Sequence, residues 1–308
     1  MKKLFLFSMC LATMAMTVLG QNRPQTPQPP YPYQTEEVSF TNDQAGATFA
    51  GTLTVPTDAK CVLLMVTGSG LQNRDEELFG HKPFAVIADY LARNGIATLR
   101  YDDRGFGEST GGDLENATTR DFADDAVAGI QWLRQSGRFP KVGILGHSEG
   151  GEIAFMLGAE NLVDFIVSLA GPGVPGDSIL LEQNRILYGE LAAGLTIDDI
   201  RNNPQIQQVP WYRYFISYDP QQDLARITCP VMALNGEKDC QVPEAMNLNA
   251  IRRTLPANEH HLFKSYPGLN HLFQHCETGL PDEYGTIEET FSVEVLNDIS
   301  IWLQQIVK

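Results

Sequence analysis

Apolar and polar positions follow two different periods along this chain. In residues 36–40 and 48–55 apolar and polar side chains alternate around Asn42-Asp43-Gln44-Ala45-Gly46, which predicts an antiparallel β-hairpin. Later segments are instead continuous apolar runs, which are typical of strands that are covered on both faces. These runs lie at residues 61–66, 96–101, 142–145, 165–169, 231–234 and 261–266.

Helical patterns lie between the apolar runs, at residues 84–91, 119–133, 153–157 and 296–306. Strands that alternate with helices of this length predict an α/β fold, with a mainly parallel central sheet and helices on both faces. Residues 172–226 are too long for an ordinary loop and are polar and helical in pattern. We therefore expect them to form a helical cap inserted over the active site.

Length and charge narrow the function classes. With 308 residues and 43% hydrophobic content, the chain can build one large core, so we expect a single domain over residues 36–308. A formal net charge of −16 disfavours nucleic acid or an anionic membrane surface as a partner. Small neutral molecules remain suitable substrates, and the oligomeric state stays open.

The N-terminal residues have the features of an export signal. Lys2 and Lys3 precede an uncharged apolar run that ends at Leu19-Gly20, a small-residue cleavage site. We expect residues 1–20 to be cleaved, which leaves a periplasmic or secreted protein without a membrane anchor. An uncleaved anchor is the alternative, although the run is short for a bilayer span. Residues 21–35 are rich in proline and predict an extended linker.

The stretch Gly146-His147-Ser148-Glu149-Gly150 lies between a predicted strand and a predicted helix. A tight turn at this place exposes its serine as a nucleophile, and its two glycines let the strand and the helix approach. Ser148 is therefore the candidate nucleophile. The N–H group of Glu149, at the start of the helix, is a candidate donor to an oxyanion.

A serine nucleophile needs a histidine base, and the base needs an acid that orients it. The carboxyl ends of later parallel strands meet the same edge of the sheet. Asp239 follows the strand at 231–234, and His271 follows the strand at 261–266, so they are the candidate acid and base. Asp177, after the preceding strand, is the alternative acid. The competing histidines His260, His261 and His275 lie in or before a strand or beyond the turn, and His147 is expected to have a structural role.

The order Ser148, Asp239, His271, together with the flanking G-x-x-D-x-x-V-P and G-x-N-H patterns, resembles the α/β-hydrolase fold family over residues 36–307. The segments 67–75 and 81–84 are similar to a bacterial group of esterases and serine aminopeptidase-like hydrolases. The common His-Gly of the oxyanion loop is Thr67-Gly68 here. The resemblance implies that the N–H of Ser69, or that of Gly70, completes the oxyanion hole beside Glu149.

Several side chains have a structural and a functional interpretation. Aromatic residues in the cap can form its own core or hold an apolar part of a substrate; they are Trp211, Tyr212, Tyr214 and Phe215. The charged run Asp102-Asp103-Arg104 is expected to stabilise its loop. Cys240 and Cys276 lie near the predicted acid and base, so a disulfide between them is possible in an oxidising compartment.

The sequence contains no H-E-x-x-H or C-x-x-C pattern and no phosphate-binding glycine loop, so it implies neither a metal nor a cofactor. The expected function is a serine carboxylesterase that hydrolyses small or medium esters through an acyl-enzyme. One alternative is a peptidase, in which Glu149, Glu152 or a carboxylate of the cap would bind the amine of the substrate. Another is a binding protein on an inactive hydrolase fold.

Overall fold

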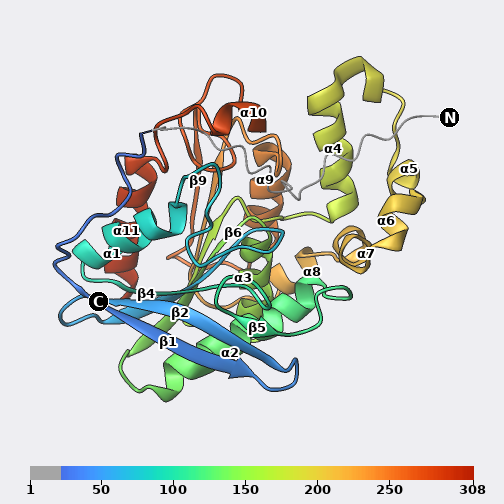
Figure 1. Ribbon diagram of the computed structural model, residues 1–308. Coiled ribbons are helices and arrows are strands. Elements are labelled where there is room, and N and C mark those ends of the chain that lie inside the picture. The colour runs from blue at the N-terminus through green and yellow to red at the C-terminus, as the bar shows by residue number, and fades with distance from the viewer. Residues whose placement is uncertain (1–21) are drawn as a thin grey trace.

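The computed structural model describes residues 22–308 (Figure 1). The predicted export signal lies outside these residues. Within them, no helix combines the length and the apolar character that crossing a bilayer requires.

A central sheet organises the fold, and its strands run in the order β1-β2-β4-β3-β6-β7-β8-β9, with the short β5 paired to β2. The pairings β1–β2, β2–β4 and β2–β5 are antiparallel, and all the others are parallel. The strands are β1 (Gln34–Asn42), β2 (Ala47–Val55), β3 (Cys61–Val66), β4 (Ala97–Tyr101), β5 (Thr110–Gly111), β6 (Lys141–His147), β7 (Ile166–Leu169), β8 (Val231–Gly236) and β9 (Leu262–Tyr266). The predicted hairpin and the mainly parallel sheet are thus confirmed.

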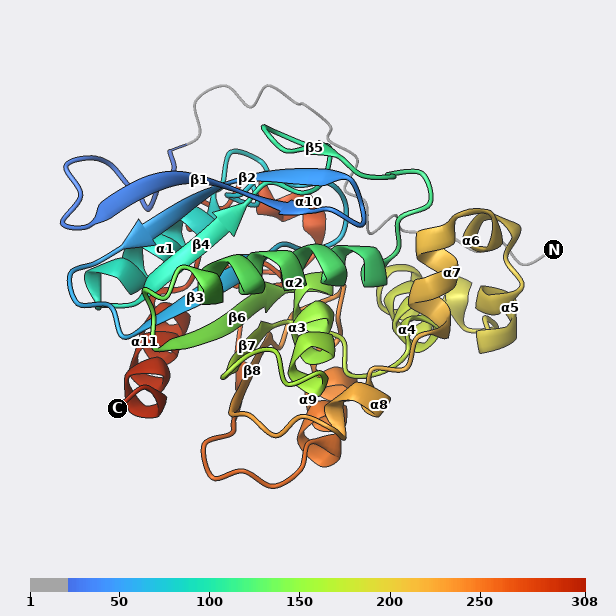
Figure 2. The same ribbon diagram turned by 90° about the horizontal axis from the view of Figure 1, so that it is seen from below.

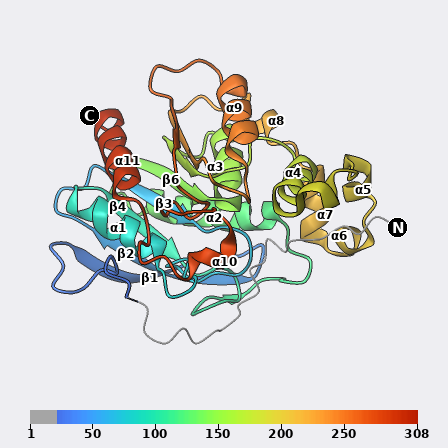
Figure 3. The same cartoon turned by 90° about the horizontal axis from the view of Figure 1, so that it is seen from above.

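Helices cover both faces of the sheet, and each face has its own apolar core. One core joins the sheet to α2, α3, α8 and α9, and the other joins it to α1 and α11. Figures 2 and 3 view the molecule from opposite sides, with α2 and α3 in front of the strands in Figure 2. The covering helices are α1 (Pro83–Arg93), α2 (Thr119–Gln135), α3 (Glu149–Ala159), α8 (Gln221–Leu224), α9 (Glu244–Thr254) and α11 (Val293–Ile306).

The long connection between β7 and β8 is helical and lies at the side of the sheet in all three views. Its helices have a separate small core that includes Ile179, Ile200 and Phe215. Before α8, this connection contains α4 (Gly176–Tyr188), the 3₁₀-helix η1 (Gly189–Ala192), α5 (Ile197–Arg201), α6 (Pro204–Gln208) and α7 (Pro210–Ser217). Because it packs mainly on itself, the connection forms a compact layer beside the carboxyl ends of the strands.

The proline-rich segment differs from the expected spacer. Arg23 donates hydrogen bonds of 2.8–2.9 Å to the carbonyl groups of Phe79, Gly285 and Ile287. The side chain of Gln25 accepts from the N–H of Thr290 and donates to the carbonyl of Phe291. In addition, β1 already begins at Gln34. Proline-rich composition prevents a core but leaves long polar side chains free to bind backbone groups, so Arg23 and Gln25 are held against the domain, whereas residues 28–32 are exposed.

Three elements were not predicted from the pattern. They are β5, α9 and α10 (Pro281–Tyr284). The helix α9 directly follows the loop that carries Asp239, and buries Asn247, Leu248, Ala250 and Ile251. Its inner face includes a polar residue, Asn247, whose amide binds the backbone at Gly173 and Pro243, so its apolar periodicity is weak.

Candidate active site

The turn between β6 and α3 is a strained elbow with Ser148 at its apex. Ser148 has φ 53° and ψ −117°, a conformation that is costly for a residue with a Cβ. A Cβ at Gly146 would lie 1.9 Å from the carbonyl oxygen of Gly150, and one at Gly150 would lie 2.1 Å from that of Val66. The two glycines are therefore required for the close approach of β6, α3 and β3 that keeps Ser148 in this position.

The predicted acid and base lie in contact at the carboxyl ends of β8 and β9. Nδ1 of His271 lies 2.7 Å from Oδ2 of Asp239, whose side chain is fully buried. Oδ1 of Asp239 accepts hydrogen bonds from the N–H groups of Gln241 and Val242, and Oδ2 accepts one from Asn235. An ionised carboxylate suits these donors, and it fixes the proton of His271 on Nδ1, so that Nε2 has a free lone pair.

The alternative acid lies elsewhere. Asp177 is buried at the start of α4 and forms an ion pair with Arg201 of α5, with Oδ2 2.6 Å from Nη2. It therefore joins two helices of the cap. Of the two candidate acids, the one that contacts His271 is Asp239.

The competing histidines also have other partners. His275 pairs with Glu289 at 2.8 Å, and His260 is exposed beside Glu259. His261 accepts the N–H of Val231 and faces the carbonyl of Pro256, at the amino ends of the strands and away from the elbow.

The loop after β3 lies directly against the elbow. A Cβ at Gly68 would lie 3.2 Å from Cβ of Ser148. The N–H of Gly68 donates to Oε1 of Glu76 at 2.7 Å, so this N–H is already engaged. Ser69 and Gly70 follow it in the same loop. The assignment of Ser69 or Gly70, with Glu149, to the oxyanion hole remains a prediction. It agrees with the hydrogen bond of the Gly68 N–H to Glu76, because this N–H is not available to an oxyanion.

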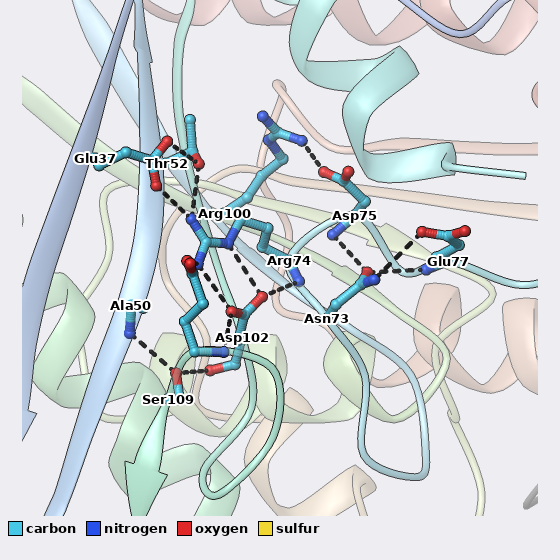
Figure 4. Close-up of polar contacts among 11 residues, drawn as sticks. Glu37, Ala50, Thr52, Asn73, Arg74, Asp75, Glu77, Arg100, Asp102 and Ser109 are labelled. Carbon is cyan, nitrogen blue, oxygen red and sulfur yellow. Dashed lines mark hydrogen bonds and ion pairs between the residues drawn. The ribbon is translucent and has the colours of Figure 1, made fainter.

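Two neighbouring carboxylates fasten this loop to the sheet. Asp103 accepts the N–H of Gln72 at 2.7 Å and the hydroxyl of Thr67. Asp102 accepts the N–H and the guanidinium of Arg74, as well as the N–H of Glu108 (Figure 4). Burial would raise the pKa of Asp102, but these hydrogen bonds lower it below its ordinary value. Arg104, the third member of the charged run, pairs with buried Asp125 of α2, so the predicted loop-stabilising role is confirmed.

The aromatic residues of the cap have different surroundings. Phe215 is buried in the core of the cap, where Trp211 stacks on it, and Tyr212 packs against the same core. Tyr214 packs against the main core of the domain and stacks on Tyr218. Most of this aromatic surface is therefore engaged within the protein, and contacts of these four residues with a substrate remain a prediction.

Trp211 connects the cap to the elbow. Its indole N–H donates to Oε1 of Glu149 at 2.7 Å. Burial raises the pKa of the Glu149 carboxyl, against hydrogen bonds that favour its ionised form. The side chain of Glu149 is therefore committed to the cap, whereas its N–H stands at the start of α3.

Glu152, one turn further along α3, is 1% exposed, and neither of its carboxyl oxygens has a hydrogen-bond partner in residues 22–308. Burial, followed by the nearby Glu149 and Asp223, raises its pKa well above the ordinary value. A buried carboxyl of this kind is expected to be protonated at neutral pH. It is poorly suited to bind the charged amine of a peptide substrate.

His147 and Glu76 form a contact that the sequence did not reveal. Nδ1 of His147 lies 2.9 Å from Oε1 of Glu76, and Nε2 lies 3.0 Å from the carbonyl oxygen of His271. The predicted structural role of His147 therefore takes place within the site. Nothing in the sequence around Glu76 indicates this contact, which spans 71 positions.

The cysteines within residues 22–308 are free thiols, including Cys240 and Cys276, so the possible disulfide between these two is absent. The two thiols lie near the carbonyl groups of Gly279 and Gly268 instead. Burial raises the pKa of Cys240 to about 12, which leaves it almost entirely protonated. Residues 22–308 contain no group of three or more side chains that could hold a metal ion.

Comparisons with known proteins agree with this geometry. Residues 82–182 match the hydrolase family described as "Serine aminopeptidase, S33". The chain is 25% identical over 260 residues to the esterase EstD of Thermotoga maritima. This alignment covers 78% of this chain and 61% of that protein. It is also 25% identical to a monoacylglycerol lipase of Mycolicibacterium smegmatis, over 70% of this chain and 81% of that protein.

Among solved structures, Est1E of Butyrivibrio proteoclasticus with bound ferulic acid has a TM-score of 0.60 and 19% identity, over 88% of this chain and 100% of that chain. The chain has the α/β-hydrolase fold. The fold predicted from the sequence is confirmed. The chain spans less than two thirds of the length of the Thermotoga esterase.

The carboxylates that fasten the loop after β3 lead to a test of stability. We expect Arg74→Met to lower the free energy of unfolding of the protein by about 3 kcal/mol at pH 7, because Asp102, 4% exposed, would stay buried without its cation. Arg138→Met is the matched control, since its partner Glu36 is 37% exposed, and should cost less than about 1 kcal/mol. Denaturant unfolding measures both changes.

The difference in the free energy of unfolding between wild type and Arg74→Met should become smaller at acidic pH. The folded pKa of Asp102 lies below its unfolded value, so its contribution is present above the ordinary aspartate range and is lost as pH falls through the folded pKa. Equal losses in the two variants at pH 7 would contradict this account of the loop.

Proposed function

We propose that this α/β-hydrolase is a serine carboxylesterase that acts on small or medium neutral esters. The observation that carries the proposal is the Asp239–His271 hydrogen bond at the edge of the sheet where Ser148 sits in its strained elbow. Relatives named as an esterase and as a monoacylglycerol lipase support the same chemistry.

Each residue has one role in the proposed reaction. His271 Nε2 takes the proton of the Ser148 hydroxyl as its oxygen attacks the ester carbonyl, and the N–H groups of Glu149 and Ser69 or Gly70 stabilise the oxyanion. His271 then donates this proton to the departing alcohol, and an acyl-enzyme remains on Ser148. Water, deprotonated by His271, releases the acid in the second half of the reaction. Asp239 stabilises the positive charge that His271 carries in each step.

Peptide hydrolysis is the competing function, because the family matched at residues 82–182 is described as serine aminopeptidase. An aminopeptidase must bind the amine of its substrate with an accessible carboxylate. Of the two carboxyl groups on α3, Glu149 is bound to Trp211, and Glu152 is enclosed. These contacts favour the ester substrate.

A panel of substrates tests the proposal. We expect p-nitrophenyl esters of short to medium chain length to turn over faster than aminoacyl p-nitroanilides. Ser148→Ala and Asp239→Asn should each lower kcat roughly 10⁴-fold, because the nucleophile or the correct tautomer of the base is lost. Asp177→Asn is the matched control and should keep kcat/KM within about threefold of wild type.

Three results would overturn the serine esterase assignment. Faster hydrolysis of the anilides would favour the peptidase. Folded wild-type protein that hydrolyses neither class, or a Ser148→Ala variant that is as active as wild type, would favour a binding protein or a different nucleophile.

We further propose that the protein is exported to the periplasm or secreted after cleavage at Gly20. The support is the sequence alone, with Lys2 and Lys3 before an apolar run and a small residue at its end. N-terminal sequencing of protein from its native cells should begin at Gln21. A mature chain that retains Lys2 and Lys3 would contradict export by cleavage.

A further inference from the structure

Glu76 occupies a restrained position in the loop between β3 and α1. It is 4% exposed and has φ 53°, an unusual conformation for a residue other than glycine. One oxygen of its carboxylate, Oε1, accepts the N–H of Gly68 at 2.7 Å and also lies 2.9 Å from Nδ1 of His147. A single carboxylate oxygen therefore joins the loop that faces Ser148 to the residue that precedes Ser148.

The other side of the His147 ring faces the loop of the base. Nε2 lies 3.0 Å from the carbonyl oxygen of His271, and the rings of His147 and His271 are tilted against each other with centroids 4.7 Å apart. A carbonyl oxygen can only accept a hydrogen bond, so Nε2 must carry a proton. Nδ1 faces a carboxylate oxygen that already accepts an N–H. Both ring nitrogens are therefore placed to donate, as in an imidazolium ion.

His261 shows the contrasting arrangement. Its Nδ1 accepts the N–H of Val231, and its Nε2 faces the carbonyl of Pro256, which requires one protonated and one unprotonated nitrogen. His261 is thus satisfied as a neutral ring. A histidine ring with one donor and one acceptor as partners is therefore satisfied when neutral. A ring with two acceptors as partners needs a proton on both nitrogens and is charged.

The charges around His147 are consistent with an imidazolium. Burial by itself lowers the pKa of His147, but the carboxylate of Glu76, the carbonyl of His271 and the charge of Asp239 together raise it above the ordinary value. The titratable groups that face the ring are Glu76 from the β3–α1 loop, Asp239 from the loop after β8, and His271 from the loop after β9. Because Glu76 balances the charge of His147, the pair adds no net charge beside the proposed base.

We propose that Glu76 and His147 form a charged positioning pair that holds the oxyanion loop and the base loop in register around Ser148. The inference rests on the proposed serine hydrolase function and goes beyond it, since neither residue belongs to the triad. Glu76 fixes Gly68 by its N–H, which directs the following N–H groups of the loop, and His147 fixes the backbone of the residue that supplies the base. The pair therefore acts on the turnover step rather than on substrate affinity.

The pair has a defined pH dependence. Because the folded pKa of His147 is raised, its stabilising contribution is present below the ordinary histidine range and is lost as pH rises through the folded pKa. Above that pKa the ring keeps only one proton, so it cannot donate to both Glu76 and His271. We expect wild-type kcat to fall on the alkaline side with little change in KM.

Three variants separate the two contacts of the ring. His147→Asn places an amide near the position of Nδ1 and keeps the contact with Glu76, whereas His147→Gln reaches the position of Nε2 and keeps the contact with the carbonyl of His271. Glu76→Gln keeps an oxygen for the N–H of Gly68 but removes the charge. We expect kcat to fall about tenfold or more in His147→Asn and Glu76→Gln, and less in His147→Gln, with KM within about threefold.

The pH profile distinguishes positioning from general support of the fold. The alkaline fall that belongs to His147 should disappear in all three variants. His261→Gln is the matched control, because it removes an equally bonded ring at the opposite edge of the sheet, and it should keep both kcat and the wild-type profile. Folded variants of Glu76 and His147 that retain wild-type kcat and the wild-type alkaline fall would overturn the proposal.

A second measurement does not require activity. In the wild-type protein labelled with ¹⁵N-histidine, the ring of His147 should show two protonated nitrogens at pH 7. Its signals are assigned by their loss in His147→Asn or His147→Gln. If neither of these variants folds, they are assigned by their contacts with His271. A ring with one proton at that pH would overturn the charged pair. Failure of the wild type to hydrolyse any ester would instead refute the proposed function, while the ring protonation would still test the pair.

Discussion

The site depends on one close approach between backbone segments. At Gly146 and Gly150 the strand β6, the helix α3 and the strand β3 are too near for any side chain, with carbonyl oxygens at 1.9–2.1 Å from an added Cβ. That approach keeps Ser148 at a positive φ, and the bond from its N–H to the carbonyl of Leu169 fixes it to the neighbouring strand. The strain is local, and the parallel sheet that surrounds the elbow maintains it.

The same type of interaction holds each loop around the elbow: a carboxylate accepts hydrogen bonds from backbone N–H groups. Asp102 and Asp103 hold the segment after β3, Asp239 holds its own turn, and Glu76 holds Gly68. Such charge-assisted bonds are stronger than neutral ones and fix direction as well as distance. The loops come from distant parts of the sequence, and each is held by a carboxylate that lies in the loop itself or directly after a strand. A chain with a large negative charge thus uses several of its carboxylates internally.

The sequence was sufficient for those features that depend on local pattern. Continuous apolar runs identified the parallel strands, the glycines identified the elbow, and the order of the strands placed Asp239 and His271 at one edge. The choice between Asp239 and Asp177 required the structure, because both follow a strand and only their tertiary partners differ. The contacts of His147 with Glu76 and with His271 were beyond prediction, since they span 71 and 124 positions and have no periodic signal. The docking of Arg23 and Gln25 was missed because composition describes a core but not single hydrogen bonds.

In the proposed mechanism, the elbow presents Ser148 as a nucleophile that His271 and Asp239 activate. Reaction of the folded protein with a fluorophosphonate probe, followed by intact mass measurement and peptide mapping, tests it most directly. We expect one adduct per chain, located on Ser148, absent in Ser148→Ala and formed much more slowly in Asp239→Asn. A folded wild-type protein that takes up no probe, or that carries it on another residue, would show that Ser148 is not the activated nucleophile.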